Sequence, residues 1–130
     1  MRGTISNDVF RLSSLQHLSF AACGLSGTIP TEIGLLSNLD FLDLSWNELT
    51  GNIPSEIGSL QERLQIIYFE YNNLNGTIPS EIGNLNQLLN LWLDGNELLS
   101  GTIPSTFLTM PLLGTFLVWM DVTMSMSFYV

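Results

Sequence analysis

The chain has 130 residues, and 12 acidic side chains against three arginines and no lysine give a formal net charge of -9. The 45% apolar composition is sufficient for a buried core and argues against a disordered acidic segment. The absence of lysine excludes lysine-dependent phosphate loops and Schiff-base chemistry. The arginines are scattered among four times as many carboxylates, so we expect no nucleic-acid partner. Residues 1–20 contain no apolar run of the length of a secretory signal.

An internal repeat organises the chain. The pattern Gly-x-Ile-Pro occurs at residues 27–30, 51–54, 76–79 and 101–104, and each copy follows a stretch in which apolar residues alternate with others. This alternation predicts one short strand per copy. The repeats begin near residues 15, 39, 64, 88 and 113, after a partial repeat at 1–14. We therefore expect one repeat array over residues 1–121 and a degenerate or frayed tail at 122–130.

Each repeat has an apolar face that it cannot bury alone. Leu42 and Leu44 face inward from their strand, and Ile53 and Ile57 continue the core around the far side of the repeat. Stacking of neighbouring repeats completes such a core, which predicts a solenoid. The residue that ends each apolar stretch is expected to turn the chain and to form an internal polar ladder. The ladder positions are Cys23, Asn47, Asn72, Asn96 and Asp121.

The pattern LxxLxxLxLxxNxLxGxIPxxIGxL resembles the plant-specific class of leucine-rich repeats, which occurs in receptor-like ectodomains and polygalacturonase-inhibitor proteins. The resemblance implies an α/β repeat solenoid, a right-handed superhelix with a concave parallel β-sheet of about five strands and loops and short 3-10 turns on the convex side. It also implies non-enzymatic protein or peptide recognition in signalling or defence, outside the cell or at its surface. Membrane attachment would come only through parts of a parent protein outside this chain.

The concave face is the expected binding surface, because solvent-facing strand residues of successive repeats line up there. Exposed aromatic rings beside carboxylates suit recognition of a basic or amphipathic peptide, with a glycan as the second choice. One alternative is a spacer within a longer array, whose aromatic residues only reflect strand preference. Another is glycan binding or the inhibition of a polysaccharide-degrading enzyme. The candidate ligand-binding residues are Phe41, Asp43, Trp46, Tyr68, Glu70, Tyr71, Trp92 and Asp94.

Other chemistry has weaker support in the sequence. Glu70 and Asp94 occupy adjacent rungs and suit a partner's Lys or Arg, whereas two carboxylates alone make a weak metal site. We expect Cys23 to be buried in the ladder and His17 to point outward, so they form no nucleophile and base pair. The sequence therefore predicts no catalytic residue, metal or cofactor.

Two further segments have two interpretations each. Asn75 begins the sequon Asn-Gly-Thr, which is a glycosylation site if the protein is secreted and otherwise ordinary turn chemistry. Residues 112–130 are nearly long enough to span a membrane, but Asp121 interrupts them and residues 113–121 keep the repeat spacing. We therefore expect a decayed terminal repeat there rather than a membrane span.

Overall fold

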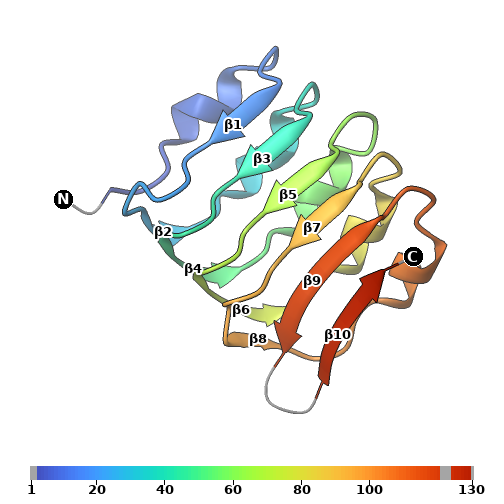
Figure 1. Ribbon diagram of the computed structural model, residues 1–130. Coiled ribbons are helices and arrows are strands. Elements are labelled where there is room, and N and C mark those ends of the chain that lie inside the picture. The colour runs from blue at the N-terminus through green and yellow to red at the C-terminus, as the bar shows by residue number, and fades with distance from the viewer. Residues whose placement is uncertain (1–2, 121–123, 130) are drawn as a thin grey trace.

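The computed structural model describes residues 3–120 and 124–129, with side chains described for residues 3–114. Successive repeats stack side by side, so that their first strands form one long sheet (Figure 1). Five strands of this sheet are parallel, and the sixth pairs antiparallel with the fifth. The strands are β1 (His17–Ser19), β3 (Phe41–Asp43), β5 (Ile66–Tyr68), β7 (Asn90–Trp92), β9 (Thr115–Met120) and β10 (Met124–Tyr129).

A second parallel sheet follows the turn in each repeat, where the sequence predicted only loops. It contains β2 (Ser26–Thr28), β4 (Glu48–Asn52), β6 (Asn73–Thr77) and β8 (Leu98–Ser100). The glycine of the Gly-x-Ile-Pro motif makes this pairing possible. A Cβ added to Gly51, which has a φ of 77°, would lie 2.9 Å from Thr28 Cγ2 of the preceding repeat. Only glycine accepts both this backbone conformation and this contact without strain.

Short 3-10 helices cover the side of the core opposite the long sheet (Figure 1). Glycine also sets how closely these helices approach one another. A Cβ at Gly58 would lie 2.5 Å from the carbonyl oxygen of Glu81, so a side chain there would push two neighbouring helices apart. Within the described residues the helices are η1 (Asn7–Arg11), η2 (Thr31–Leu35), η3 (Ser55–Ser59), η4 (Ser80–Asn84) and η5 (Ser105–Thr109).

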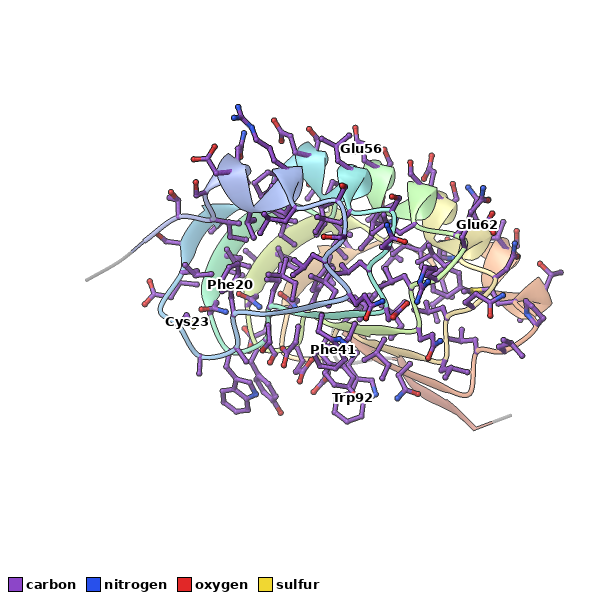
Figure 2. The ribbon with its side chains drawn as sticks, turned by 90° about the horizontal axis from the view of Figure 1, so that it is seen from above. Phe20, Cys23, Phe41, Glu56, Glu62 and Trp92 are labelled. Carbon is purple, nitrogen blue, oxygen red and sulfur yellow. The ribbon has the colours of Figure 1, made fainter. Side chains whose placement is uncertain are left out.

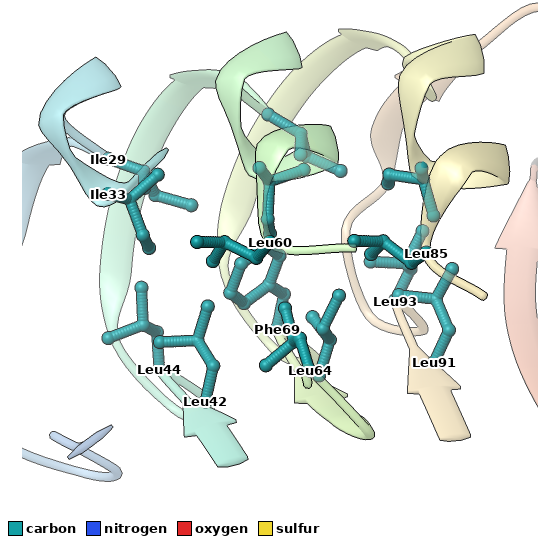
Figure 3. Close-up of a cluster of buried hydrophobic side chains, with 14 of the residues drawn as sticks. Ile29, Ile33, Leu42, Leu44, Leu60, Leu64, Phe69, Leu85, Leu91 and Leu93 are labelled. Carbon is teal, nitrogen blue, oxygen red and sulfur yellow. The ribbon is translucent and has the colours of Figure 1, made fainter. Parts of the chain in front are cut away.

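The core runs without a break through the stacked repeats, between the long sheet and the helices (Figure 3). Leu42 and Leu44 from one repeat and Leu91 and Leu93 from another occupy equivalent inward positions, and all four are buried. Burial of one leucine side chain stabilises a fold by roughly 1.5–3 kcal/mol, so the regular stack is the main source of stability. This packing leaves the other face of the long sheet available to solvent and ligands.

The C-terminal segment contains two strands, β9 and β10. β9 continues the parallel sheet at the expected register, with Asn90 opposite Thr115, and β10 lies within the segment that the sequence predicted to be frayed. Among the described residues, no helix has the length and apolar character needed to cross a membrane.

Candidate functional site

The asparagine at the end of each strand holds two repeats together. Asn47 Nδ2 donates hydrogen bonds to the carbonyl oxygens of Leu44, in its own repeat, and Phe20, in the preceding repeat, at 2.9 and 2.8 Å. Its Oδ1 accepts from the backbone N–H groups of Cys23 and Leu25 at 3.1 and 2.9 Å. Each buried amide thus replaces backbone hydrogen bonds that the turn leaves unmade.

The next two asparagines repeat the arrangement one and two rungs further on. Asn72 Oδ1 accepts from the backbone N–H of Leu49, and its Nδ2 donates to the carbonyl oxygens of Leu44 and Phe69. Asn96 is fully buried, and its Nδ2 donates to Phe69 O at 2.9 Å. These bonds fix the turn that follows each strand, and with it the residues on either side.

The expectation of a buried Cys23 was wrong, because this cysteine is exposed. β1 is the edge strand of the long sheet, so no strand of that sheet stacks beyond the Cys23 turn. Its Sγ donates to Ala21 O, at 3.4 Å, and makes no bond to another repeat within the described residues. Asp121, the last expected ladder position, lies outside the described residues.

A row of aromatic rings crosses the concave face. Parallel pairing places Asp43 opposite Tyr68 and Tyr68 opposite Trp92. The Tyr68 and Trp92 rings stack with centroids 4.5 Å apart, and Phe41 meets Tyr68 edge to face at 5.7 Å. Phe41 and Trp92 project from the side opposite Glu56 and the 3-10 helices (Figure 2). Adjacent strands therefore supply three rings in a row, in which Tyr68 contacts both Phe41 and Trp92, and all three are half-buried and partly open to solvent.

A second ring pair lies just beyond the strands, at the turns. Trp46 and Tyr71 stack with centroids 4.0 Å apart, and their side chains are 59% and 45% exposed. Both have left-handed backbones, with φ of 56° and 54°, which is unusual for a bulky residue and common at functional sites. The equivalent residue in the next repeat is Gly95, and a Cβ there would lie 2.6 Å from Tyr71 Cδ1. The Tyr71 ring therefore covers the position that Gly95 leaves open.

The carboxylates of the predicted site differ sharply in burial. Asp43 and Asp94 are half-buried, and Asp43 Oδ1 accepts hydrogen bonds from Ser45 N at 3.0 Å and Ser45 Oγ at 2.6 Å. Glu70 was expected to face solvent, but only 7% of it is exposed. Ser45, at the equivalent position one repeat earlier, is also buried, whereas Asp94, at the equivalent position one repeat later, is half-buried.

Burial leaves Glu70 in an unfavourable electrostatic environment. Desolvation, reinforced by the nearby charges of Asp43 and Asp94, raises the pKa of Glu70 to about 6, although its own backbone N–H acts in the opposite direction. Glu70 Oε2 and Trp92 Nε1 are both buried, and neither has a hydrogen-bond partner. The site therefore contains an acceptor and a donor that nothing in the described part of the chain satisfies.

Positive side chains lie elsewhere on the molecule. Arg63 makes a two-pronged contact with Asp40, at 2.8 and 3.1 Å, which lowers the pKa of that carboxyl. Arg11 pairs with Asp8 at 3.8 Å on the helical side. Residues 3–114 contain no group of three or more His, Cys, Asp or Glu side chains placed to hold a metal ion.

Two other features lie away from the concave face. Asn75 lies in β6, half-buried beside Gly76, and pairs across the second sheet with Asn52 and Leu98. An open groove of about 800 Å³ borders the same sheet and the starts of the 3-10 helices, and Asn52, Pro54, Thr77, Pro79 and Thr102 are among its lining residues. None of the predicted ligand-binding residues lines it.

Sequence reasoning overlooked Ser45 and Gly95, which position the candidate site. Ser45 restrains the Asp43 carboxylate, and Gly95 makes room for Tyr71. A signal for Gly95 was available, because it alone carries no side chain in the column that also holds Ala22, Trp46 and Tyr71.

Comparisons with known proteins agree with this geometry. The family model of the leucine-rich repeat matches residues 14–36, 38–60 and 63–85. The PEPR1–AtPEP1 crystal structure is similar with a TM-score of 0.85 and 38% identity, over 91% of this chain and 16% of that chain. The ectodomain of the Arabidopsis receptor kinase HAESA, in complex with an IDA peptide hormone, gives 0.83 and 34%, over 88% and 19%.

A third structure is a complex between two proteins. The BIR3–SERK2 complex from Arabidopsis thaliana gives a TM-score of 0.75 and 42% identity, over 81% of this chain and 55% of that chain. The chain therefore spans less than two thirds of the length of each of these three structures. None of the curated proteins matches the chain.

Proposed function

Because this chain belongs to the leucine-rich-repeat family, in the form found in plant receptor ectodomains, we propose that it is a non-enzymatic recognition module that binds a peptide or protein on its concave face. The observation that carries the proposal is the contiguous aromatic row formed by Phe41, Tyr68 and Trp92. Rings of this kind supply large contact areas at low entropic cost, and they are enriched among the residues that dominate binding energies.

The charge of the face indicates the kind of ligand. Asp43 and Asp94 flank the aromatic row and Glu70 lies beneath it, whereas the described arginines are engaged with Asp40 and Asp8 on other surfaces. A basic or amphipathic segment is therefore complementary in charge and in apolar surface. Two of the similar structures are complexes, PEPR1 with AtPEP1 and HAESA with a peptide hormone, which supports a peptide or protein over a glycan.

The test is a binding screen of the whole chain against peptide libraries and oligosaccharide arrays. We expect peptide hits whose affinity falls at least about tenfold in the Tyr68→Ala/Trp92→Ala double variant. The matched control is Leu35→Ala/Leu108→Ala, which removes two exposed apolar side chains from the helical side. Equal losses in both variants, or no hits in the peptide screen, would favour the spacer interpretation. Hits on the oligosaccharide array alone would favour a glycan.

The location of the protein is a separate part of the proposal. Its plant receptor relatives are ectodomains, so we place this chain outside the cell or at its surface. A secreted protein would carry a glycan at Asn75, on the second sheet and away from the concave face. Expression through a plant secretory pathway should give a mass increase that disappears in Asn75→Gln and remains in Asn73→Gln. An unmodified secreted protein would remove this site from the proposal.

A further inference from the structure

The concave face contains three carboxylates on successive rungs and a buried acceptor with no donor. We propose that Asp43 and Asp94, with Glu70 beneath them, hold a cationic side chain of the ligand, an arginine or a lysine. This inference rests on the proposed function, because it identifies the anchor residue of the peptide that the aromatic row binds. It assigns the charged end of that residue to the carboxylates and its aliphatic stem to the Tyr68 and Trp92 rings.

The first argument is the uncompensated charge. Asp43 and Asp94 are both close enough to Glu70 to disfavour its ionised form. Within the described residues no arginine offsets these charges. Arg63 is held by Asp40, which precedes β3, whereas Asp43 is at the other end of that strand, and Arg11 lies on the helical side. His17 lies on β1, one rung from Asp43 and two rungs from Glu70, and its ring neighbours Phe41. A ligand cation relieves the repulsion among all three carboxylates at once.

The second argument is the unpartnered acceptor. Glu70 is more than nine-tenths buried, and its Oε2 has no hydrogen-bond partner in the described structure. Such an atom is costly, and native proteins pair nearly all of them. The buried donor Trp92 Nε1, one rung away, is also unpartnered, so it does not serve as the partner of Glu70. An ammonium or guanidinium group provides several donors and full charge compensation.

The third argument is the surrounding apolar surface. Tyr68 and Trp92 present stacked rings beside the carboxylates, with centroids 4.5 Å apart. Aromatic faces attract cations and also pack against the methylene stems of arginine and lysine. A divalent metal ion needs a different site, because calcium takes six to eight oxygen ligands and the described residues contain no metal-binding cluster.

The experiment uses the full chain, labelled with ¹⁵N, and two small probes of nearly identical shape. Acetyl-arginine amide carries the charge, whereas acetyl-citrulline amide lacks it. The Trp92 Nε1–H resonance, assigned with Trp92→Phe, is the reporter. We expect saturable shifts of this resonance with the arginine probe and at least about tenfold weaker binding of the citrulline probe. Asp43→Asn, Glu70→Gln and Asp94→Asn should each weaken arginine binding, and the convex-side control Glu56→Gln should not.

The dependence on pH provides a readout that a structural role of Glu70 does not give. The charged groups that face Glu70 are Asp43 from the β3 rung and Asp94 from the β7 rung. Protonation of Glu70 removes one of the three negative charges, so the arginine probe should bind several-fold more weakly at pH 5 than at pH 7.5. Glu70→Gln should lose most of this dependence, whereas Glu56→Gln should keep it.

Several outcomes would overturn the proposal. Equal binding of the two probes, or shifts confined to another surface, would show that no cation site exists here. Saturable shifts with calcium chloride below millimolar concentration would identify a metal site instead. Peptide hits that are neutral or acidic and still need Tyr68 and Trp92 would overturn the cation anchor while leaving the proposed function intact. Binding of the arginine probe without any peptide hit would support the cation site and would contradict the proposed peptide-binding function.

Discussion

Asn72 and Glu70 are two residues apart and both are buried, but they differ in how fully the polar atoms of their side chains are hydrogen-bonded. The Asn72 amide bonds to backbone groups of two repeats, whereas Glu70 Oε2 has no partner in the described structure. Both sites lie in the same turn, so burial alone does not explain the difference. A satisfied buried polar group stabilises the stack, and an unsatisfied one raises the free energy of the unbound state. The first contributes to the fold, and the second is suited to a partner.

The largest expected effect on stability comes from removing the Asn72 amide, whose hydrogen bonds join two repeats. Asn72→Ala leaves the buried N–H of Leu49 without its side-chain acceptor. It also removes one of the two asparagine donors from each of the carbonyl oxygens of Leu44 and Phe69, which Asn47 and Asn96 still reach. We expect a loss of about 3 kcal/mol in the free energy of unfolding, measured by urea denaturation followed by circular dichroism. Asn73→Ala is the control, because Asn73 is exposed. Similar losses in both variants would show that the ladder is not the source of stability.

Replacement of Glu70, the residue with an unpartnered oxygen, should increase the free energy of unfolding at neutral pH. A pKa raised from 4.5 to about 6 means that folded Glu70 holds its proton more tightly than the unfolded chain does. The stability it contributes is present below pH 4.5 and is lost as the pH rises through about 6. Glu70→Gln should therefore increase the free energy of unfolding at pH 7.5 by about 1–2 kcal/mol and leave it unchanged at pH 4.

The measurement for Glu70→Gln is a set of urea titrations between pH 4 and pH 8. Glu81→Gln, which removes a charge from the exposed helical side, is the control and should show little change across this range. A destabilised Glu70→Gln at pH 7.5 would mean that the charged carboxylate already has a favourable partner, which would remove the contrast with Asn72.

A smaller loss of stability is expected at the turn position between Glu70 and Asn72, which Tyr71 occupies in this repeat and Gly95 in the next. Gly95→Ala introduces a Cβ at a φ of 70°, 2.6 Å from the Tyr71 ring. We expect a loss of about 1–2 kcal/mol in thermal or urea unfolding, with a change in tyrosine fluorescence as the ring moves. Gly114→Ala is the matched control, because among the described atoms the nearest neighbour of a Cβ there is Leu89 O, at 3.8 Å. An undisturbed Gly95→Ala variant would contradict the packing of Tyr71 over this residue.

The smallest effect concerns the exposed ring pair. A double-mutant cycle with Trp46→Ala and Tyr71→Ala should give a coupling energy of about 0.5–1.5 kcal/mol, because stacked rings stabilise each other beyond the area they bury. The measurement is the unfolding free energy of the wild type, both single variants and the double variant. A coupling near zero would mean that the two rings are held apart in solution and do not form a common surface.

The repeat spacing predicted most of the fold, because similar repeats place equivalent residues in equivalent environments. It placed Leu42 and Leu44 in the core and Tyr68 beside Trp92 on the concave face. The spacing did not predict burial correctly where a residue's environment depends on more than its position in its own repeat. Cys23 is exposed because β1 is an edge strand, and Glu70 is buried although Asp94, at the same position of the next repeat, is half-buried.

The second sheet escaped prediction for a related reason. Glycine disfavours strands on average, but Gly51 is required by a threonine of the preceding repeat, and a pattern within one repeat does not contain this contact. The unpartnered atoms of Glu70 and Trp92 were also beyond the sequence, because hydrogen-bond satisfaction depends on side-chain positions in three dimensions.

The regular pairing of β3, β5 and β7 also sets a length scale for recognition. Neighbouring strands in a sheet are about 4.8 Å apart, so the rungs that carry Phe41, Tyr68 and Trp92 span only about 10 Å along the array. An extended peptide advances about 3.3 Å per residue, so this distance corresponds to about three residues of ligand. A peptide bound as proposed would therefore contact these three rungs with about three of its residues, and each added repeat would extend that contact by one or two residues.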